Sequence, residues 1–225
     1  RARGADRVSS YGDFAAVSDV VDVSLAKFLQ MEVSDGIIAP GYEPEALEIL
    51  KQKKKGKYVV LKMDPDYEPP SIETREVFGV VLEQRRNDRR ITADLFDNVV
   101  TRNKEISDDA KRDLLVATVT VKYTQSNSVC FAYGGQVIGN GAGQQSRVHC
   151  VRLAAGKADM WFLRQHPDVL DLPFKEGLPR PVINNAIDGF LSDELTEAEL
   201  KHWQESFTKP PVRLTKDQKR EWLAK

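Results

Sequence analysis

Residues 122–150 read KYTQSNSVCFAYGGQVIGNGAGQQSRVHC and hold the densest run of turn glycines and neutral polar side chains in the chain. The pattern predicts a strand at 128–133, a hairpin turn at 134–135 and a second strand at 136–139. From Gln144 the apolar residues recur every three to four positions, which indicates a helix. A strand, a glycine-rich loop and a helix N-terminus leave backbone N–H groups free beside the positive end of a helix dipole. The stretch therefore suits a polar or anionic ligand.

The glycine-rich segment at 139–144, Gly-Asn-Gly-Ala-Gly-Gln, differs from both common phosphate-binding motifs. Gln144 stands where the dinucleotide fingerprint needs its third glycine, and no Gly-Lys-Ser/Thr follows. Taken alone, the segment is equally compatible with a tight turn that enters a helix. Asn127 before the first strand and Arg147 in the first helical turn favour a ligand. Because a cation in a first turn opposes the helix dipole, we expect Arg147 to have an anionic or carbonyl partner.

The segments upstream of this stretch predict an α/β arrangement. A short apolar run at 36–40 is typical of a buried strand, and Pro44 stands at the first position of a helix that reaches 52. A strand at 58–63 follows, so the three elements form a right-handed parallel crossover. The lysine-rich run at 53–57 between them predicts a solvated turn. The other predicted elements are a helix at 25–32 capped by Ser24, a strand at 77–82, a helix at 108–123 that begins after Ser107, a proline-containing loop at 167–181, and helices at 159–165, 182–191, 196–207 and 215–225.

Composition places the chain among globular proteins without a dominant charge. Its 225 residues are 41% hydrophobic and 30% charged, with 33 Lys and Arg against 34 Asp and Glu. This balance favours neither a nucleic-acid nor a membrane partner, and no apolar run approaches the length of a membrane span. Cys130 and Cys150 are too few for a disulfide framework. We therefore expect a soluble cytosolic protein whose cysteines are reduced.

The run at 122–149, together with Val-Ser-Asp-Gly-Ile-Ile-Ala-Pro-Gly at 33–41, resembles a bifunctional purine-biosynthesis family. That family joins aminoimidazole carboxamide ribonucleotide (AICAR) formyltransferase to inosine monophosphate (IMP) cyclohydrolase. The resemblance extends from residue 1 to about 187 and falls in the formyltransferase part. It implies a cytidine-deaminase-like α/β fold with a helical C-terminal segment, truncated in this chain. Residues 1–105 would belong to the first formyltransferase subdomain, 106–165 would begin the second, and 166–225 would form the helical segment.

The resemblance implies formyl transfer from 10-formyltetrahydrofolate to the 5-amine of AICAR during IMP synthesis. That amine is a poor nucleophile because it is conjugated with the neighbouring carboxamide. Catalysis then needs a general base on the amine, a donor for the developing formyl oxyanion and strict positioning of two large ligands. The family works as a homodimer in which both subunits contribute residues to each formyltransferase site.

The resemblance also assigns individual residues. Asn127 matches a catalytic residue that contacts the nucleotide, and its neutral amide suits an oxyanion donor. Gly12, Asp35 and Arg147 match nucleotide contacts, and Val148 matches the apolar neighbour that lines the folate pocket. Without the resemblance, Asn127 reads as a turn asparagine, Asp35 as an N-cap or turn aspartate, and Val148 as a core residue.

Metal expectations follow from the same match. A potassium site of the family resembles a set with oxygen ligands in this chain, namely Val121, Thr124, Ser126 and Ser128. Alternating hydroxyl residues are also common where a strand begins. The zinc signature of deaminases, His-x-Glu with Pro-Cys-x-x-Cys, does not occur in the sequence, so we expect neither zinc nor deamination.

Two functions stay open at this point. The resemblance places the family's catalytic Lys-His pair upstream of Arg1 and further ligand residues beyond Lys225. We therefore expect a fragment that lacks formyltransferase activity by itself. The alternative is a non-catalytic nucleotide-binding or dimerisation module on the same α/β frame. The combination of Asn127, Arg147 and Asp35 favours the enzyme, because binding some nucleotide does not require all three.

Overall fold

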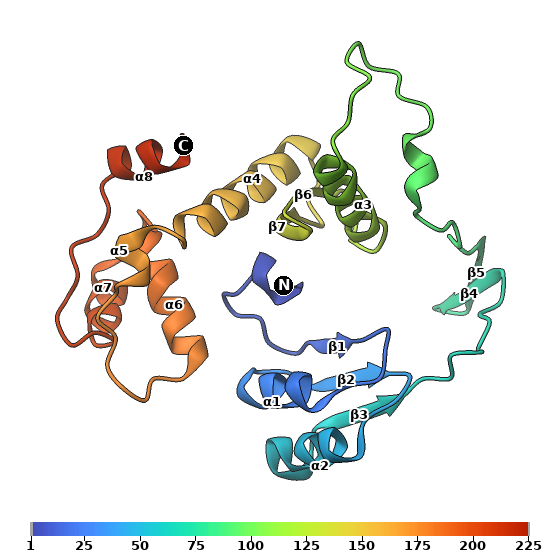
Figure 1. Cartoon of the computed structure of the whole chain (residues 1–225), viewed down its shortest axis with the longest axis horizontal. Helices are drawn as coiled ribbons and strands as arrows, with labels where there is room; N and C mark the ends of the chain where they lie inside the picture. The colour runs from blue at the N-terminus through green and yellow to red at the C-terminus, as the bar shows by residue number, and fades with distance from the viewer. Residues whose placement is uncertain (1, 225) are drawn as a thin grey trace. The chain divides into compact units, whose positions relative to one another are not determined.

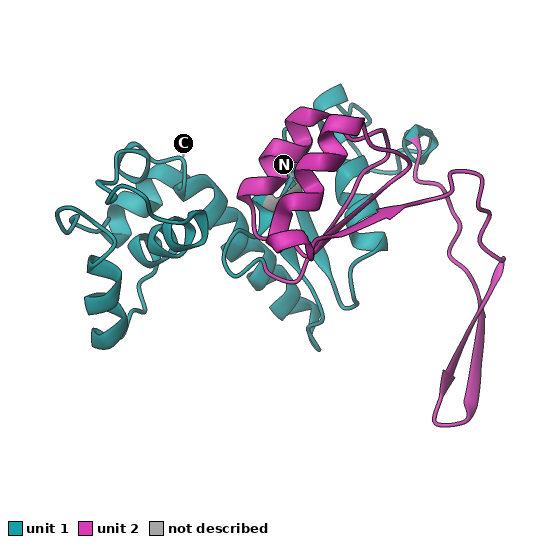
Figure 2. Cartoon of the chain, turned by 90° about the horizontal axis from the view of Figure 1, so that it is seen from below, with its two compact units in different colours: residues 1–10, 93–225 teal, residues 11–92 magenta. Residues whose placement is uncertain are grey.

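The computed structural model describes residues 2–224 and shows a mixed α/β protein (Figure 1). It divides into two compact units, one of residues 11–92 and one of residues 1–10 with 93–225 (Figure 2). The predicted α/β class is confirmed. The cytidine-deaminase-like layering and the subdomain boundaries at 105 and 165 stay predictions. Among the described residues, no helix is both long and apolar enough to cross a membrane.

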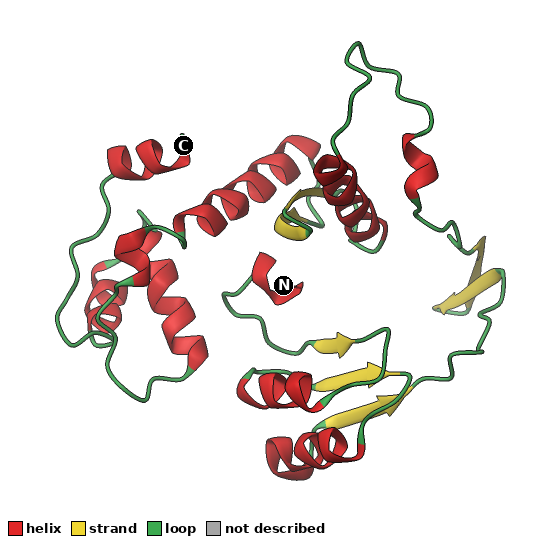
Figure 3. Cartoon of the chain, viewed as in Figure 1, coloured by secondary structure: helices red, strands yellow, loops and turns green. Residues whose placement is uncertain are grey.

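The unit of residues 11–92 contains a parallel sheet with two helices (Figure 3). Its strands are β1 (Phe14–Ala16), β2 (Gly36–Ala39) and β3 (Val59–Lys62), with β2 in the centre, and its helices are α1 (Val23–Met31) and α2 (Pro44–Gln52). The predicted crossover is confirmed, because β2 and β3 are parallel and α2 joins them. Ile37, Ala39 and Leu50 are fully buried in the core of this unit.

Two predictions for this unit need correction. Asp22, not Ser24, is the N-cap of α1, and its carboxylate accepts the Leu25 N–H at 2.7 Å. The lysine-rich run forms the short helix η2 (Lys53–Gly56), but it is not merely solvated. The Lys53 ammonium donates to the Glu32 carbonyl at 2.5 Å, and Lys54 pairs with Asp35.

The predicted single strand at 77–82 is instead the turn of a hairpin. Strands β4 (Ile72–Val77) and β5 (Val80–Arg85) pair in antiparallel fashion and form a two-stranded sheet of their own. Phe78 and Gly79 at the turn have φ of 50° and 78°, which is the backbone of a type I′ turn. The sequence pattern did not predict this turn because the run around it is apolar, and Gly79 is its one residue that favours a reversal of chain direction. All strand residues except Val77 are exposed.

The other unit contains the glycine-rich stretch. Helix α3 (Asp108–Lys122) is capped by Ser107 as predicted, and β6 (Val129–Tyr133) and β7 (Gln136–Gly141) form the predicted hairpin. Gly134 and Gly135 at its turn have φ of 60° and 71°, where glycine is the favoured residue. Helix α4 (Arg147–Leu163) follows, and it begins three residues later than the pattern indicated.

Strand β7 continues two residues beyond the predicted end at 139, so Gly141 lies in the strand rather than in a loop. A Cβ at Gly139 would stand 2.1 Å from the Ala154 carbonyl oxygen, and one at Gly141 would stand 2.2 Å from that of Cys150. The strand therefore packs directly on the backbone of α4. Gly143, with φ of 64°, is the motif glycine that serves a turn.

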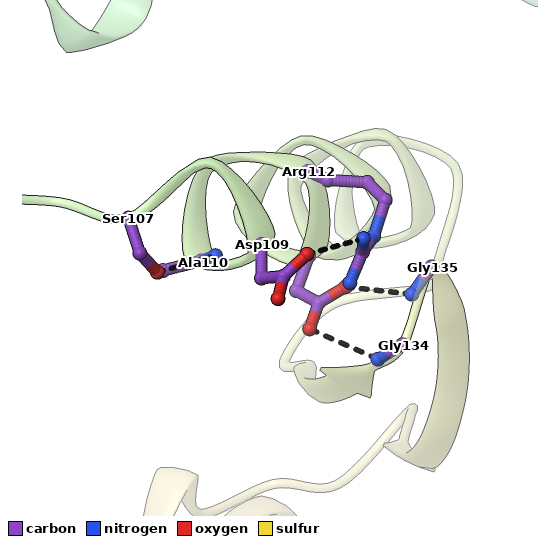
Figure 4. A network of polar contacts seen from close by, with 7 residues as sticks. Ser107, Asp109, Ala110, Arg112, Gly134 and Gly135 are labelled. Carbon is purple, nitrogen blue, oxygen red and sulfur yellow. Dashed lines mark hydrogen bonds and ion pairs between the residues drawn. The ribbon is translucent and has the colours of Figure 1, made fainter.

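Asp113 connects α3 to the β6–β7 turn through hydrogen bonds from Gly134 and Gly135, which are labelled in Figure 4. Its carboxylate accepts the Gly135 N–H at 2.6 Å and the Gly134 N–H at 3.0 Å, and it also accepts from the Arg112 Nε at 3.2 Å. The bond from Gly135 is the main cause that holds the pKa of Asp113 below its ordinary value, with smaller contributions from Gly134 and Arg112 against the opposing effect of desolvation.

The C-terminal helices share one core. They are α5 (Pro167–Leu170), α6 (Arg180–Leu191), α7 (Glu197–Gln204) and α8 (Lys216–Leu223), so the predicted loop at 167–181 contains one short helix and the start of another. Phe190, Trp203 and Phe207 are buried together, and the Trp203 indole N–H donates to the Ala186 carbonyl at 2.7 Å. The short helices η1 (Ala2–Ala5) and η3 (Ala93–Phe96) complete the unit.

We expect Gly139→Ala to destabilise the protein by about 1–3 kcal/mol or more, because its methyl group would overlap the Ala154 carbonyl in a packed interior. Gly156→Ala is the matched control. A Cβ at Gly156 meets open space inside α4, so this change should add about 0.5–1 kcal/mol of stability through helix propensity. Urea unfolding followed by circular dichroism measures both. Equal stability of Gly139→Ala and the wild type would contradict the direct strand–helix contact.

We expect Asp113→Asn to lower the urea midpoint at pH 7, because the amide cannot accept from both glycines and Arg112 as a carboxylate does. A carboxyl group whose folded pKa is lowered stabilises the fold above its unfolded pKa, and this contribution disappears as the pH falls through the folded pKa. The difference between variant and wild type should therefore shrink below about pH 4. Asp217→Asn, at an exposed carboxylate, is the control. A difference that does not depend on pH would contradict the ionised clamp.

Candidate functional site

The predicted site residues fall into two sets, one in each compact unit. Gly12 and Asp35 lie within residues 11–92, whereas Asn127, Arg147 and Val148 lie in the other unit. Each set is described within its own unit.

Asn127 joins the segment before β6 to the segment before α4. Its amide Nδ2 donates to the Gln145 carbonyl at 3.1 Å, and its backbone carbonyl accepts from the Cys150 thiol at 3.0 Å. The Gly143 N–H also donates to the Gln125 carbonyl at 3.0 Å. The two segments are thus held side by side at the start of α4, and the Ser126–Asn127 peptide within them is cis.

The Asn127 amide keeps hydrogen-bonding capacity for a ligand. A primary amide has two N–H donors and one carbonyl acceptor, and within the described chain its side chain makes the single bond to Gln145. One donor and the oxygen are therefore available. The bond to Gln145 orients this amide, so the turn asparagine and the ligand contact are compatible roles for one residue.

Arg147 and Val148 open α4 and both are exposed. Ser146 is the N-cap, but its side chain makes no capping hydrogen bond, so the first turn keeps unsatisfied N–H groups. Among residues 2–224, none forms a hydrogen bond or ion pair with the Arg147 guanidinium, so the partner expected from the sequence is not in this part of the chain. Val148 is 56% exposed, so it is not the core residue that the pattern alone suggested.

Asp35 and Gly12 are brought together at the start of β2. The Asp35 N–H donates to the Asp13 carbonyl at 2.8 Å, and its carboxylate pairs with Lys54. Gly12 has φ of 74°, and a Cβ there would lie 3.7 Å from the Asp35 Oδ2. Asp35 precedes a strand, so it is not an N-cap. Its half-exposed carboxylate faces a glycine, which leaves room for a polar ligand.

The four residues of the expected potassium set gather at the end of α3 and the loop after it. The Val121 carbonyl accepts the Thr124 N–H at 3.2 Å, and the Thr124 hydroxyl donates to the Thr120 carbonyl at 2.7 Å. The Asn140 Nδ2 donates to this hydroxyl at 3.3 Å, while the buried Asn140 Oδ1 has no hydrogen-bond partner. An orphaned buried oxygen beside hydroxyl groups fits a cation that prefers oxygen ligands.

Two contacts of these residues were missed from the sequence. Lys54 is one of several lysines in its run, so composition did not single it out as the partner of Asp35. Asn140 stands between glycines and read as part of a turn, although it lies in β7. Among the described residues, no cluster of three or more His, Cys, Asp or Glu could hold a metal ion.

One Lys-His pair does occur in the chain, at Lys201-His202 in α7. The His202 side chain is 89% exposed, and its Nδ1 lies 3.3 Å from Glu205 Oε2. This pair sits on the outer surface of a helix, in neither set of site residues.

Comparison with known proteins gives a consistent answer. The sequence model of the AICARFT/IMPCHase bienzyme family matches residues 1–157. A bifunctional purine biosynthesis protein PurH from Roseobacter denitrificans is 31% identical over 187 residues, which cover 83% of this chain and 33% of the relative. Proteins of the same name from two strains of Cereibacter sphaeroides are 33% identical over 158 residues, or 70% of this chain and 30% of each relative. The chain thus spans about a third of the length of these relatives.

We expect Arg147→Gln to leave the unfolding free energy unchanged or to raise it by about 0.3–1 kcal/mol, because it removes a partnerless cation from a helix N-terminus. Asn127→Ala should instead cost about 1 kcal/mol, since it removes a hydrogen bond to Gln145. Urea unfolding of the two variants tests this contrast. A loss above about 1 kcal/mol for Arg147→Gln would show that the side chain has a structural partner.

Proposed function

Since the chain belongs to the AICARFT/IMPCHase bienzyme family, we propose that it acts in purine biosynthesis as part of an AICAR formyltransferase. The reaction transfers the formyl group of 10-formyltetrahydrofolate to the 5-amine of AICAR on the way to IMP, and the parent protein would also be an IMP cyclohydrolase. The fold would be the cytidine-deaminase-like α/β fold of that enzyme, working in the cytosol as a homodimer.

One observation carries the proposal: Asn127, with a free amide donor, is bonded to the segment that opens α4, where Val148 is exposed and Arg147 has no partner among residues 2–224. The Asn127–Gln145 and Asn127–Cys150 bonds hold these three residues at one helix N-terminus. Formyl transfer needs a hydrogen-bond donor for the developing oxyanion. A cation suits an anionic or carbonyl group of the nucleotide, and an apolar surface suits the folate. A structural turn requires none of the three to be accessible.

The chemistry can be assigned to atoms. The AICAR amine attacks the formyl carbon, and the carbonyl oxygen becomes an oxyanion that accepts the free Asn127 N–H. The new C–N bond forms, the bond to N10 of the folate breaks, and the proton lost by the amine finally resides on N10. One such donor contributes about 10²- to 10³-fold to the rate. Asn127 is therefore the catalytic residue that we propose in this chain.

The remaining residues would bind and position the two ligands. Arg147 would pair with an anionic or carbonyl group of the nucleotide, and the free N–H groups of the first α4 turn favour the same charge. Val148 would contact the folate through its exposed apolar face. In the unit of residues 11–92, the Asp35 carboxylate would accept from ribose hydroxyls, and Gly12 would allow close approach of the ligand.

A potassium ion would fit beside this site. Val121, Thr124, Ser126 and Ser128 would supply oxygen ligands, and the orphaned Asn140 Oδ1 points to an additional acceptor in need of a cation or a donor. Such an ion would fix the end of α3 and the segment that carries Asn127. No zinc is proposed.

The general base is not among the contacts of Asn127, whose neighbours are the Gln145 carbonyl and the Cys150 thiol. The exposed Lys201-His202 pair does not supply it either. We therefore expect the purified chain to show no folate-dependent turnover of AICAR. The lack of a general base among the contacts of Asn127 also favours the second candidate, a nucleotide-binding or dimerisation module without catalysis.

A chimera separates the two candidates. We would replace the corresponding segment of the Roseobacter denitrificans PurH protein by this chain and measure formyl transfer. Retained activity is expected, and Asn127→Ala in the chimera should lower kcat by about 10²- to 10³-fold with little change in the KM for AICAR. Asn185→Ala, at an exposed asparagine of α6, is the matched control and should change neither constant. Equal losses in kcat and nucleotide affinity would favour the binding module.

A further inference from the structure

A cavity of about 340 Å³ lies against α4, and Asn127 is not among the residues that line it. Its walls come from the N-terminal segment, from α4 and from α6, and α4 contacts both η1 and α6. Its volume is at the small end of the range for ligand-binding pockets. None of the residues proposed for formyl transfer lines it, so the inference below is independent of that function.

The cavity carries an excess of positive charge. Four cationic side chains line it against two acidic ones, which leaves a net charge of +2. The charged residues are Arg7, Arg152, Lys157 and Arg164, with Asp6 and Asp188. Lys157 is neutralised by an ion pair with Asp6.

Arg164 lines the cavity, and its side chain is partly buried. Its guanidinium donates to the Asn184 carbonyl at 3.2 Å and to the Asn184 side-chain oxygen at 3.5 Å, so both bonds go to neutral groups. Burial is the main cause that lowers its pKa. Asp188 opposes this effect, and the charge of Arg7 lowers the pKa further. Burial likewise raises the pKa of Asp188 above its ordinary value, despite the charge of Arg164. A partly desolvated guanidinium whose hydrogen bonds go only to neutral groups is costly unless an anion joins it.

The rim supplies two more guanidinium groups that have no competing partner. Within residues 2–224, Arg7 and Arg152 form no hydrogen bond or ion pair, and both are exposed. Trp161 and Met160 complete the lining with apolar surface. A guanidinium group is planar and can donate two parallel hydrogen bonds to the oxygens of a phosphate. Three such groups around one cavity offer more donors than a single carboxylate can accept, which favours a phosphate.

We propose that this cavity binds a phosphate-type dianion, as inorganic phosphate or as a small phosphomonoester. Arg164 holds the anion from below, and Arg7 and Arg152 close on it from the rim. The net charge of +2 is offset by the two negative charges of the ligand. The organic part of a phosphomonoester would contact Trp161 and Met160. Inorganic phosphate would not contact these two side chains.

Isothermal titration of the full chain with inorganic phosphate and with ribose 5-phosphate, in a low-salt buffer free of phosphate, tests the proposal. We expect saturable binding at one site that weakens as sodium chloride is added. Tighter binding of ribose 5-phosphate would identify a phosphomonoester as the natural ligand, and equal affinity would identify phosphate itself. Absence of saturable binding of both compounds overturns the proposal.

The double variant Arg7→Gln/Arg152→Gln locates the site, and it removes no hydrogen bond or ion pair among residues 2–224. We expect it to weaken binding by at least about tenfold, because charge-assisted hydrogen bonds to the anion are lost. The control Arg90→Gln/Arg220→Gln changes the net charge equally at exposed positions elsewhere and should bind as the wild type does. Equal weakening in both variants would show non-specific attraction and overturn the proposal.

The indole N–H signals of the tryptophans give a second, structural readout. We expect phosphate to shift the signal of Trp161, assigned with Trp161→Phe, and to leave those of Trp203 and Trp222 in place. Shifts confined to the latter two would overturn the location. Arg147→Gln should bind phosphate normally, so a failure of the formyltransferase proposal would not be mistaken for a failure of this one.

Discussion

The approach of β7 to the backbone of α4 is the constraint on which the larger unit depends. Gly139 and Gly141 allow strand and helix to lie in direct backbone contact, with no space for a side chain at either position. This contact fixes where α4 begins, and so it fixes Arg147 and Val148 relative to Asn127. The Asp113 clamp on the hairpin turn secures the other end of the same hairpin. The glycine-rich motif, which the sequence suggested was a ligand-binding loop, thus mainly allows β7 and α4 to pack closely.

The proposed chemistry and the structural contacts use different atoms of the same residues. Asn127 uses one amide N–H and its backbone carbonyl in hydrogen bonds to Gln145 and Cys150, and its second amide N–H is available to a ligand. Asp35 is paired with Lys54 and still half-exposed. By contrast, Arg147 forms no hydrogen bond or ion pair with any of residues 2–224, so its guanidinium is available to a ligand. The same holds for the cavity lined by α4, where Arg7 and Arg152 form no hydrogen bond or ion pair with any of residues 2–224.

Local patterns predicted most of the elements. Pro44 at a helix start, Ser107 at an N-cap and the glycine pair at 134–135 each act through backbone preferences that do not depend on distant residues. The errors occurred where one residue overrode a run: Gly79 turned an apolar strand into a hairpin, and Asp22 displaced Ser24 as a cap. The apolar stripe expected on α4 is largely exposed, whereas Cys150 and Ala154 face β7.

The sequence by itself determined the α/β class, most of the elements and the residues that resemble a formyltransferase site. These depend on short-range periodicity, turn chemistry and residue identity, all of which can be read along the chain. Only the tertiary structure decided that Asn127 bonds to Gln145, that Lys54 reaches Asp35, and that Arg7 and Arg164 line one cavity. These pairs are separated by 18, 19 and 157 residues, and their meeting is set by how elements pack, which no local pattern encodes.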